Sequence, residues 1–164
     1  MTMDNNETKS YVAIMIQSLN KKQRLLDKII IKNNEQAELF KGDHHNNDLL
    51  ETNVKEKSDL LDQLNLLDNG FEKLYNRTKE ELDSNRARYA ADIRQMQDLI
   101  KGITERGARI EAQEKHNHTL ATNYFSTSQQ RIGKVRNTNK VAELYRQNMR
   151  GTSYIESHFW DKKK

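Results

Sequence analysis

The sequence predicts an all-α fold, namely an elongated antiparallel helical hairpin plus a third long helix. This coiled-coil-like bundle is followed by a weakly structured C-terminal tail. The 164 residues contain no proline, the residue that most strongly breaks helices. Apolar side chains recur every three or four positions from Tyr11 to about Leu82 and again from Tyr89 to Tyr124, which is the spacing of amphipathic helices. With 34% hydrophobic and 32% charged residues, narrow apolar seams fit the composition better than a thick globular core.

The first helix is expected to begin at Asn6 or Thr8 and to end at about Lys41. Its seam follows a strict four-three spacing: Val12, Ile16, Leu19, Gln23, Leu26, Ile30, Asn33, Ala37 and Phe40. Gln23 and Asn33 are polar, and polar seam residues usually set the register of neighbouring helices at a cost in stability. Gly42 and Asp43 supply the stop, because glycine can adopt the left-handed conformation that caps helix ends.

A second helix is expected from about Asn47 to Asp83. Its seam consists of Lys57, Leu60, Leu64, Leu67, Phe71, Leu74 and Thr78. Leu61, Leu66 and Leu82 widen this stripe, so the helix is predicted to contact two neighbours. The run Asp83-Ser84-Asn85 is predicted to form the turn and the N-cap of the next helix.

The third helix is expected from about Arg86 to Gln129, and it completes a bundle domain over residues 1–130. At 1.5 Å per residue it would span roughly 65 Å, against roughly 50 Å for each of the other two, so it is predicted to project beyond the hairpin. Its seam is Tyr89, Ile93, Met96, Ile100, Ile103, Gly107 and Ile110. The pattern fades at Glu114 and Asn117 and recovers at Ala121 and Tyr124.

The C-terminal segment, residues 131–164, has a different character. It holds nine basic and three acidic residues, and its apolar residues occur in short pieces separated by Asn137-Thr138-Asn139 and Gly151. Short isolated helices are marginal in water, so these pieces need a surface, which either the chain's own bundle or a partner must supply. Residues from about Arg131 onward are predicted to be poorly packed in the free protein and to order on a partner's helix. The predicted contacts to that partner are Ile110, Leu120, Tyr124, Val141, Leu144, Tyr145, Met149, Tyr154, Phe159 and Trp160.

Charge and residue types narrow the function classes. Residues 1–85 carry 12 basic and 16 acidic residues and residues 86–164 carry 16 and 8, so the basic half suits an acidic partner or contact with the acidic half. Nucleic-acid binding is not expected, because the basic residues between Arg86 and Arg150 are widely spaced and interleaved with acids. The paired histidines His44-His45 and His116/His118 lack the spacing of helical metal ligands. No catalytic motif or cofactor motif is present, and no cysteine. With no evident signal peptide or membrane span, the sequence predicts a soluble cytoplasmic binding protein and not an enzyme.

The N-terminal half resembles the FlgN-type flagellar export chaperones of bacteria, in particular their clostridial, Gram-positive branch. The resemblance covers roughly residues 10–125. It is carried by Glu35-Gln36-Ala37-Glu38-Leu39-Phe40-Lys41-Gly42-Asp43, by Leu49-Leu50, by Lys55-Glu56-Lys57-Ser58-Asp59-Leu60-Leu61-Asp62-Gln63-Leu64-Asn65-Leu66-Leu67-Asp68 and by Asp68-Asn69-Gly70-Phe71-Glu72-Lys73-Leu74-Tyr75. The ending Phe159-Trp160-Asp161-Lys162-Lys163-Lys164 departs from the family pattern.

The resemblance implies a small cytoplasmic chaperone of the flagellar type III secretion system. Such a chaperone binds the C-terminal helices of hook–filament junction proteins, keeps them monomeric and delivers them to the export apparatus. Two alternatives remain at this point. One is the related filament-cap type of flagellar chaperone, and the other is a structural coiled-coil protein whose heptads form a homodimer.

Overall fold

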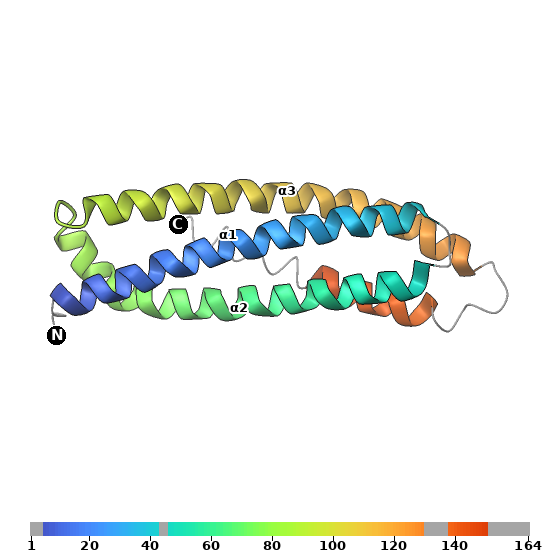
Figure 1. The fold of residues 1–164 in the computed structure, drawn as a ribbon, viewed down its shortest axis with the longest axis horizontal. Coiled ribbons are helices and arrows are strands. Elements are labelled where there is room, and N and C mark those ends of the chain that lie inside the picture. Colours follow the sequence, from blue (N-terminus) through green and yellow to red (C-terminus); the bar gives the residue numbers. More distant parts are fainter. Residues whose placement is uncertain (1–4, 43–45, 130–137, 151–164) are drawn as a thin grey trace.

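The computed structural model describes residues 5–42, 46–129 and 138–150, which form helices and short turns and no strand. Three long helices follow one another: α1 (Asn5–Lys41), α2 (Asn47–Ser84) and α3 (Ala90–Gln129). A fourth helical stretch covers residues 138–150 and is called the C-terminal helix below. The predicted all-α fold, with a helical hairpin and a third long helix, is confirmed (Figure 1).

Figure 1 shows an elongated bundle in which α1 lies between α2 and α3. α1 packs along both neighbours, whereas the backbones of α2 and α3 hardly approach each other. The chain runs along the bundle in α1, returns in α2 and runs forward again in α3. The C-terminal helix lies beside the first part of α2, at the end of the bundle where α1 is joined to α2.

The apolar seams form two separate clusters. The first occupies most of the bundle length and joins all three long helices, with buried members Val12, Met15, Leu19, Leu25, Leu26, Ile29, Ile30, Leu60, Leu61, Leu64, Leu82, Tyr89, Met96, Ile103 and Ile110. Leu67, Phe71 and Leu74, which the sequence places on the seam of the second helix, also pack against this cluster. The second cluster lies at the end where α1 joins α2, with buried members Phe40, Leu50, Val54, Ala121, Tyr124, Val141 and Tyr145.

The helix ends differ from prediction in two details. α1 stops at Lys41 as expected, and the Gly42 amide donates to the carbonyl oxygens of Glu38 and Leu39 at 3.1 and 3.3 Å. Gly42 is nevertheless not in the left-handed conformation. Its small size matters instead, since a Cβ there would lie 2.6 Å from the Asn46 side-chain amide. α3 begins at Ala90 and not near Arg86, because residues 85–89 form a turn.

The seam of α3 does not fade where the sequence suggested. Glu114 and Asn117 are buried, at 8% and 1% exposure; Glu114 pairs with Lys57 of α2, and Asn117 donates to the Asn33 carbonyl oxygen of α1. α3 is only slightly longer than its neighbours, and its seam stays covered as far as Tyr124. Leu66 was expected to widen the stripe of α2, but it is 73% exposed.

Candidate functional site

A groove runs between α2 and α3, with α1 as its floor. The backbones of α2 and α3 hardly approach each other, and the two helices meet through side chains such as the Lys57–Glu114 pair. In the half of the bundle near the α2–α3 turn this groove is open and holds a cavity of about 700 Å³. Its apolar lining comes from all three helices: Met15, Leu19, Leu67, Phe71, Leu82, Ile93, Met96, Ile100 and Ile103.

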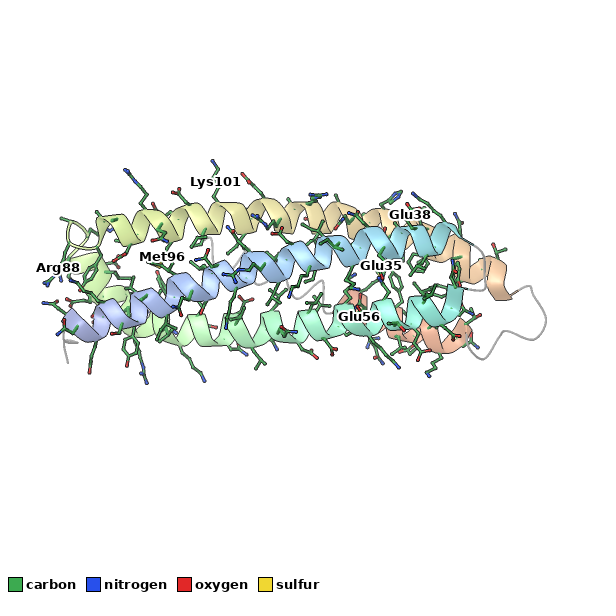
Figure 2. The ribbon with its side chains drawn as sticks, in the orientation of Figure 1. Glu35, Glu38, Glu56, Arg88, Met96 and Lys101 are labelled. Atoms are coloured by element: carbon green, nitrogen blue, oxygen red, sulfur yellow. The ribbon has the colours of Figure 1, made fainter. Side chains whose placement is uncertain are left out.

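The walls of the open groove expose large apolar side chains. Ile100 on α3 is 41% exposed and Tyr75 on α2 is 48% exposed. The rings of Phe71 and Tyr75 stack at a centroid distance of 6.3 Å, which holds both on the α2 wall. Figure 2 shows Met96 on the inner side of α3, whereas Lys101 projects outward from the same helix. The groove therefore offers an apolar surface with charged outer faces, as helix-binding grooves do.

A buried ion pair lies in the floor of the open groove. The Lys22 ammonium of α1 donates to the Asp68 carboxylate of α2 at 2.6 Å, and the two side chains are 8% and 5% exposed. Both residues line the cavity. Paired in this way they present little net charge to a bound molecule, so the floor suits an apolar surface with a polar group near its centre.

In the other half of the bundle the C-terminal helix fills the same groove. Asn47 of α2 donates to Thr138 at 3.4 Å, and Lys140 forms an ion pair with Glu51 at 3.0 Å. Further along, Asn148 donates to the Ser58 hydroxyl at 3.2 Å. These contacts place the C-terminal helix along α2 and in the same direction as α2. Its axis therefore points toward the open half of the groove.

Aromatic rings fix the C-terminal helix on the bundle. Phe40 of α1 makes an edge contact with Tyr145 at 5.3 Å and a tilted contact with Tyr124 of α3 at 5.6 Å. The Tyr124 hydroxyl donates to Asn47 at 2.5 Å. Val141 is 1% exposed and Tyr145 is 3% exposed, so both contribute to the core of the second cluster. At this end the molecule is a four-helix bundle, and at the other end it is a three-helix bundle with an open groove.

A layer of buried polar residues separates the two apolar clusters. Lys57 of α2 pairs with Glu114 of α3, and the Lys57 side chain is fully buried. Asn117 donates to Gln36 at 3.3 Å, and Gln36 donates to Asn53 at 3.1 Å. Buried polar groups of this kind specify which residues face one another, because any shift in register would leave them without partners.

Burial changes the proton affinity of two groups around this layer. Burial lowers the pKa of Lys57, and the charge of Glu114 and its hydrogen bond oppose that effect. Burial raises the pKa of Tyr145, and the nearby Glu114 carboxylate raises it further. The Tyr145 hydroxyl has no hydrogen-bond partner among the described residues. The C-terminal helix therefore places a neutral phenol next to a buried ion pair.

The predicted partner-binding residues fall into three groups. Ile110, Tyr124, Val141 and Tyr145 are buried inside the chain's own bundle, and Leu120, Leu144 and Met149 are partly buried against the second cluster. Tyr154, Phe159 and Trp160 lie outside the described residues. The expectation of poor packing from Arg131 onward is wrong for residues 138–150, because this stretch packs on the bundle, the other option that the sequence left open. Whether any of the ten residues contacts a partner stays a prediction.

Sequence reasoning did not single out the open groove. The sequence places the wall residues Leu67, Phe71, Met96 and Ile100 on the helix seams, and all four line the groove. Apolar spacing identifies the inner face of a helix but does not tell whether another helix covers it. An available signal was the length of the C-terminal helix, since residues 138–150 can cover only part of helices with 37 to 40 residues.

Within residues 5–42, 46–129 and 138–150, no cluster of three or more histidine, aspartate or glutamate side chains could hold a metal ion. None of the helices in these same ranges has the length and apolar character needed to cross a membrane.

No protein-family model, curated protein or solved structure matches this chain. The similarity to the FlgN-type export chaperones therefore rests on the sequence motifs alone.

Proposed function

We propose that this protein is a cytoplasmic chaperone that binds an amphipathic helix of a client protein in the open half of the groove between α2 and α3. The protein would perform no reaction and need no cofactor. The sequence resemblance suggests the client class, namely the C-terminal helices of flagellar hook–filament junction proteins, which the chaperone would keep monomeric for type III export.

One observation carries the proposal: the chain already holds an amphipathic helix of its own in this groove. The C-terminal helix buries Val141 and Tyr145 between α2 and α3. The open half continues the same channel with apolar walls and a floor whose charges are paired. A client helix that presents apolar residues at positions i, i+3 or i+4, and i+7 would pack there as the C-terminal helix does in the other half.

The structural coiled-coil alternative finds less support in the packing. The α1 seam is the most regular heptad surface that a homodimer could use. Within a single chain, Val12, Met15, Leu26 and Ile29 of α1 are at most 1% exposed. These residues already contact α2 and α3, so the same seam would have to leave the bundle before it could form a dimer.

Matched aspartate variants test the groove. Ile100→Asp puts a charge on the groove wall, and Ile31→Asp makes the same substitution at an α1 residue that is 61% exposed and does not line the groove. The probe is a set of purified C-terminal helical segments of hook–filament junction proteins, titrated calorimetrically into each chain. Ile100→Asp is expected to weaken binding at least tenfold, about 1.4 kcal/mol, and Ile31→Asp to leave it unchanged.

Two results would contradict the proposal. If the unmodified chain binds none of these segments, the client class is wrong. If Ile100→Asp binds as tightly as the unmodified chain, the groove is not the binding surface. Circular dichroism of both variants checks that the helices are intact.

A further inference from the structure

We propose that the last 14 residues of the chain, residues 151–164, occupy the open half of the groove in the absence of a client. This occupant continues directly from the C-terminal helix, and it is part of the chain itself and not a second copy or another protein. In this position residues 151–164 would compete with a client helix for the groove. Only that competition with clients rests on the proposed function, because occupation of the groove by the chain's own end does not require any client.

The direction of the C-terminal helix is the first argument. Its start pairs with Asn47 and its end with Ser58, so it advances along α2 toward the open groove. It lies between α2 and α3, the same two helices that form the groove walls. A chain that continues past Arg150 in this direction enters the open half directly, since the first groove residue on α2 is Leu67, about 14 Å beyond Ser58 at 1.5 Å per residue.

The length of the remaining segment is the second argument. Fourteen residues span about 21 Å as a helix and about 46 Å when extended. The groove lining on α2 runs from Leu67 to Asp83, about 24 Å of helix. Counted from the level of Ser58, which Asn148 contacts, Trp160 would lie about 18 Å along α2 in the helical case and about 36 Å in the extended case. The helical position lies near Phe71 and the extended one near Leu82, so both fall within the groove.

The chemistry of the segment is the third argument. It contains four large apolar residues, which are Tyr154, Ile155, Phe159 and Trp160. The groove exposes apolar side chains that this segment could cover, since Ile100 and Tyr75 are 41% and 48% exposed among the described residues. Burial of apolar area on both sides stabilises the contact in proportion to the area removed from water.

The single tryptophan of the chain makes the proposal directly measurable. Trp160 is the only source of tryptophan fluorescence, so its emission maximum and its quenching by acrylamide report its own surroundings. The full-length chain is compared with a synthetic peptide of residues 151–164. In the full-length chain we expect a blue-shifted emission maximum and quenching several-fold weaker than in the peptide.

The Ile100→Asp and Ile31→Asp variants locate the contact. Ile100→Asp is expected to shift Trp160 emission and quenching toward the values of the free peptide, and Ile31→Asp to leave both unchanged. Circular dichroism shows whether each variant keeps its helices. Since no client is present, this experiment can fail while client binding succeeds, and the reverse also holds.

Three outcomes would overturn the proposal. Trp160 in the full-length chain can be as accessible as in the peptide, which would mean that the groove is not covered by this segment. Trp160 can stay protected from acrylamide quenching in a folded Ile100→Asp variant, which would place Trp160 on another surface. Protection can also disappear on dilution, which would identify a second copy as the occupant.

Discussion

Removing one member of the buried Lys57–Glu114 pair is expected to destabilise the bundle strongly, whereas replacing both is not. The Lys57 side chain is fully buried and that of Glu114 is 10% exposed, so neither charge can be hydrated if its partner is lost. Breaking a buried pair on one side typically costs 3–5 kcal/mol, roughly a third of the stability of an ordinary domain. Lys57→Met should therefore lower the free energy of unfolding by about 3–5 kcal/mol.

The double variant Lys57→Met/Glu114→Leu should restore most of this loss, because it fills the site with apolar side chains and leaves no charge behind. Such replacements range from neutral to about 1–4 kcal/mol more stable than the original pair. Urea unfolding followed by circular dichroism measures all three chains. The matched control is the exposed pair of Arg106 and Asp27, whose side chains are 31% and 52% exposed at a distance of 2.7 Å. Arg106→Gln should cost less than about 1 kcal/mol.

The reasoning would be refuted if Lys57→Met cost no more than Arg106→Gln, since the pair would then be hydrated. If the double variant were as unstable as the single one, the expected gain from removing both charges would be absent. In that case the polar layer would stabilise the fold itself, and not only specify how the helices are aligned.

Three further outcomes can be checked by the same unfolding measurements. Leu64→Ala should cost about 2–4 kcal/mol, because Leu64 is 1% exposed in the first cluster. Gly70→Ala should stabilise by about 1 kcal/mol because open space surrounds it, whereas Gly102→Ala should gain less or destabilise because its Cβ would lie 2.5 Å from the Gln23 amide. Tyr145→Phe should be neutral or stabilising at pH 7, since the hydroxyl has no partner among the described residues. The pKa of Tyr145 in the folded chain is raised above its ordinary value of 10.0. The contribution of this neutral phenol to the free energy of unfolding is therefore fully present below pH 10 and is lost as the pH rises further. Tyr145→Phe should remove that alkaline loss.

Helix identity and hairpin pairing could be predicted because they depend on local periodicity. The seam of α1 repeats at four-three spacing over its whole length, and the polar break after Lys41 leaves only one place for the turn. The polar seam residue Gln23 shows how register is set. Its side-chain amide donates to the Leu99 carbonyl oxygen of α3 at 3.1 Å, next to Gly102, where a larger residue would interfere.

The burial and the partners of Glu114 and Asn117 could not be predicted. The sequence pattern of a polar seam residue is the same whether the residue is exposed to solvent or paired inside the bundle. Asn117 donates to the Asn33 carbonyl oxygen of α1 at 2.9 Å, a contact between residues more than 80 positions apart. No local pattern contains that information. The same holds for the C-terminal helix, whose few apolar residues do not indicate which surface covers them.

The C-terminal helix stabilises the end of the bundle where α1 joins α2. Val141 and Tyr145 complete the second cluster, and burial of each such side chain contributes about 1.5–3 kcal/mol. Loss of the C-terminal helix would also expose Phe40 and Val54, so residues 138–150 act as part of the core. If residues 151–164 cover the open groove as proposed, they would do so beside a cluster that residues 138–150 already complete. A client helix could then displace residues 151–164 while the four-helix end of the bundle stays intact.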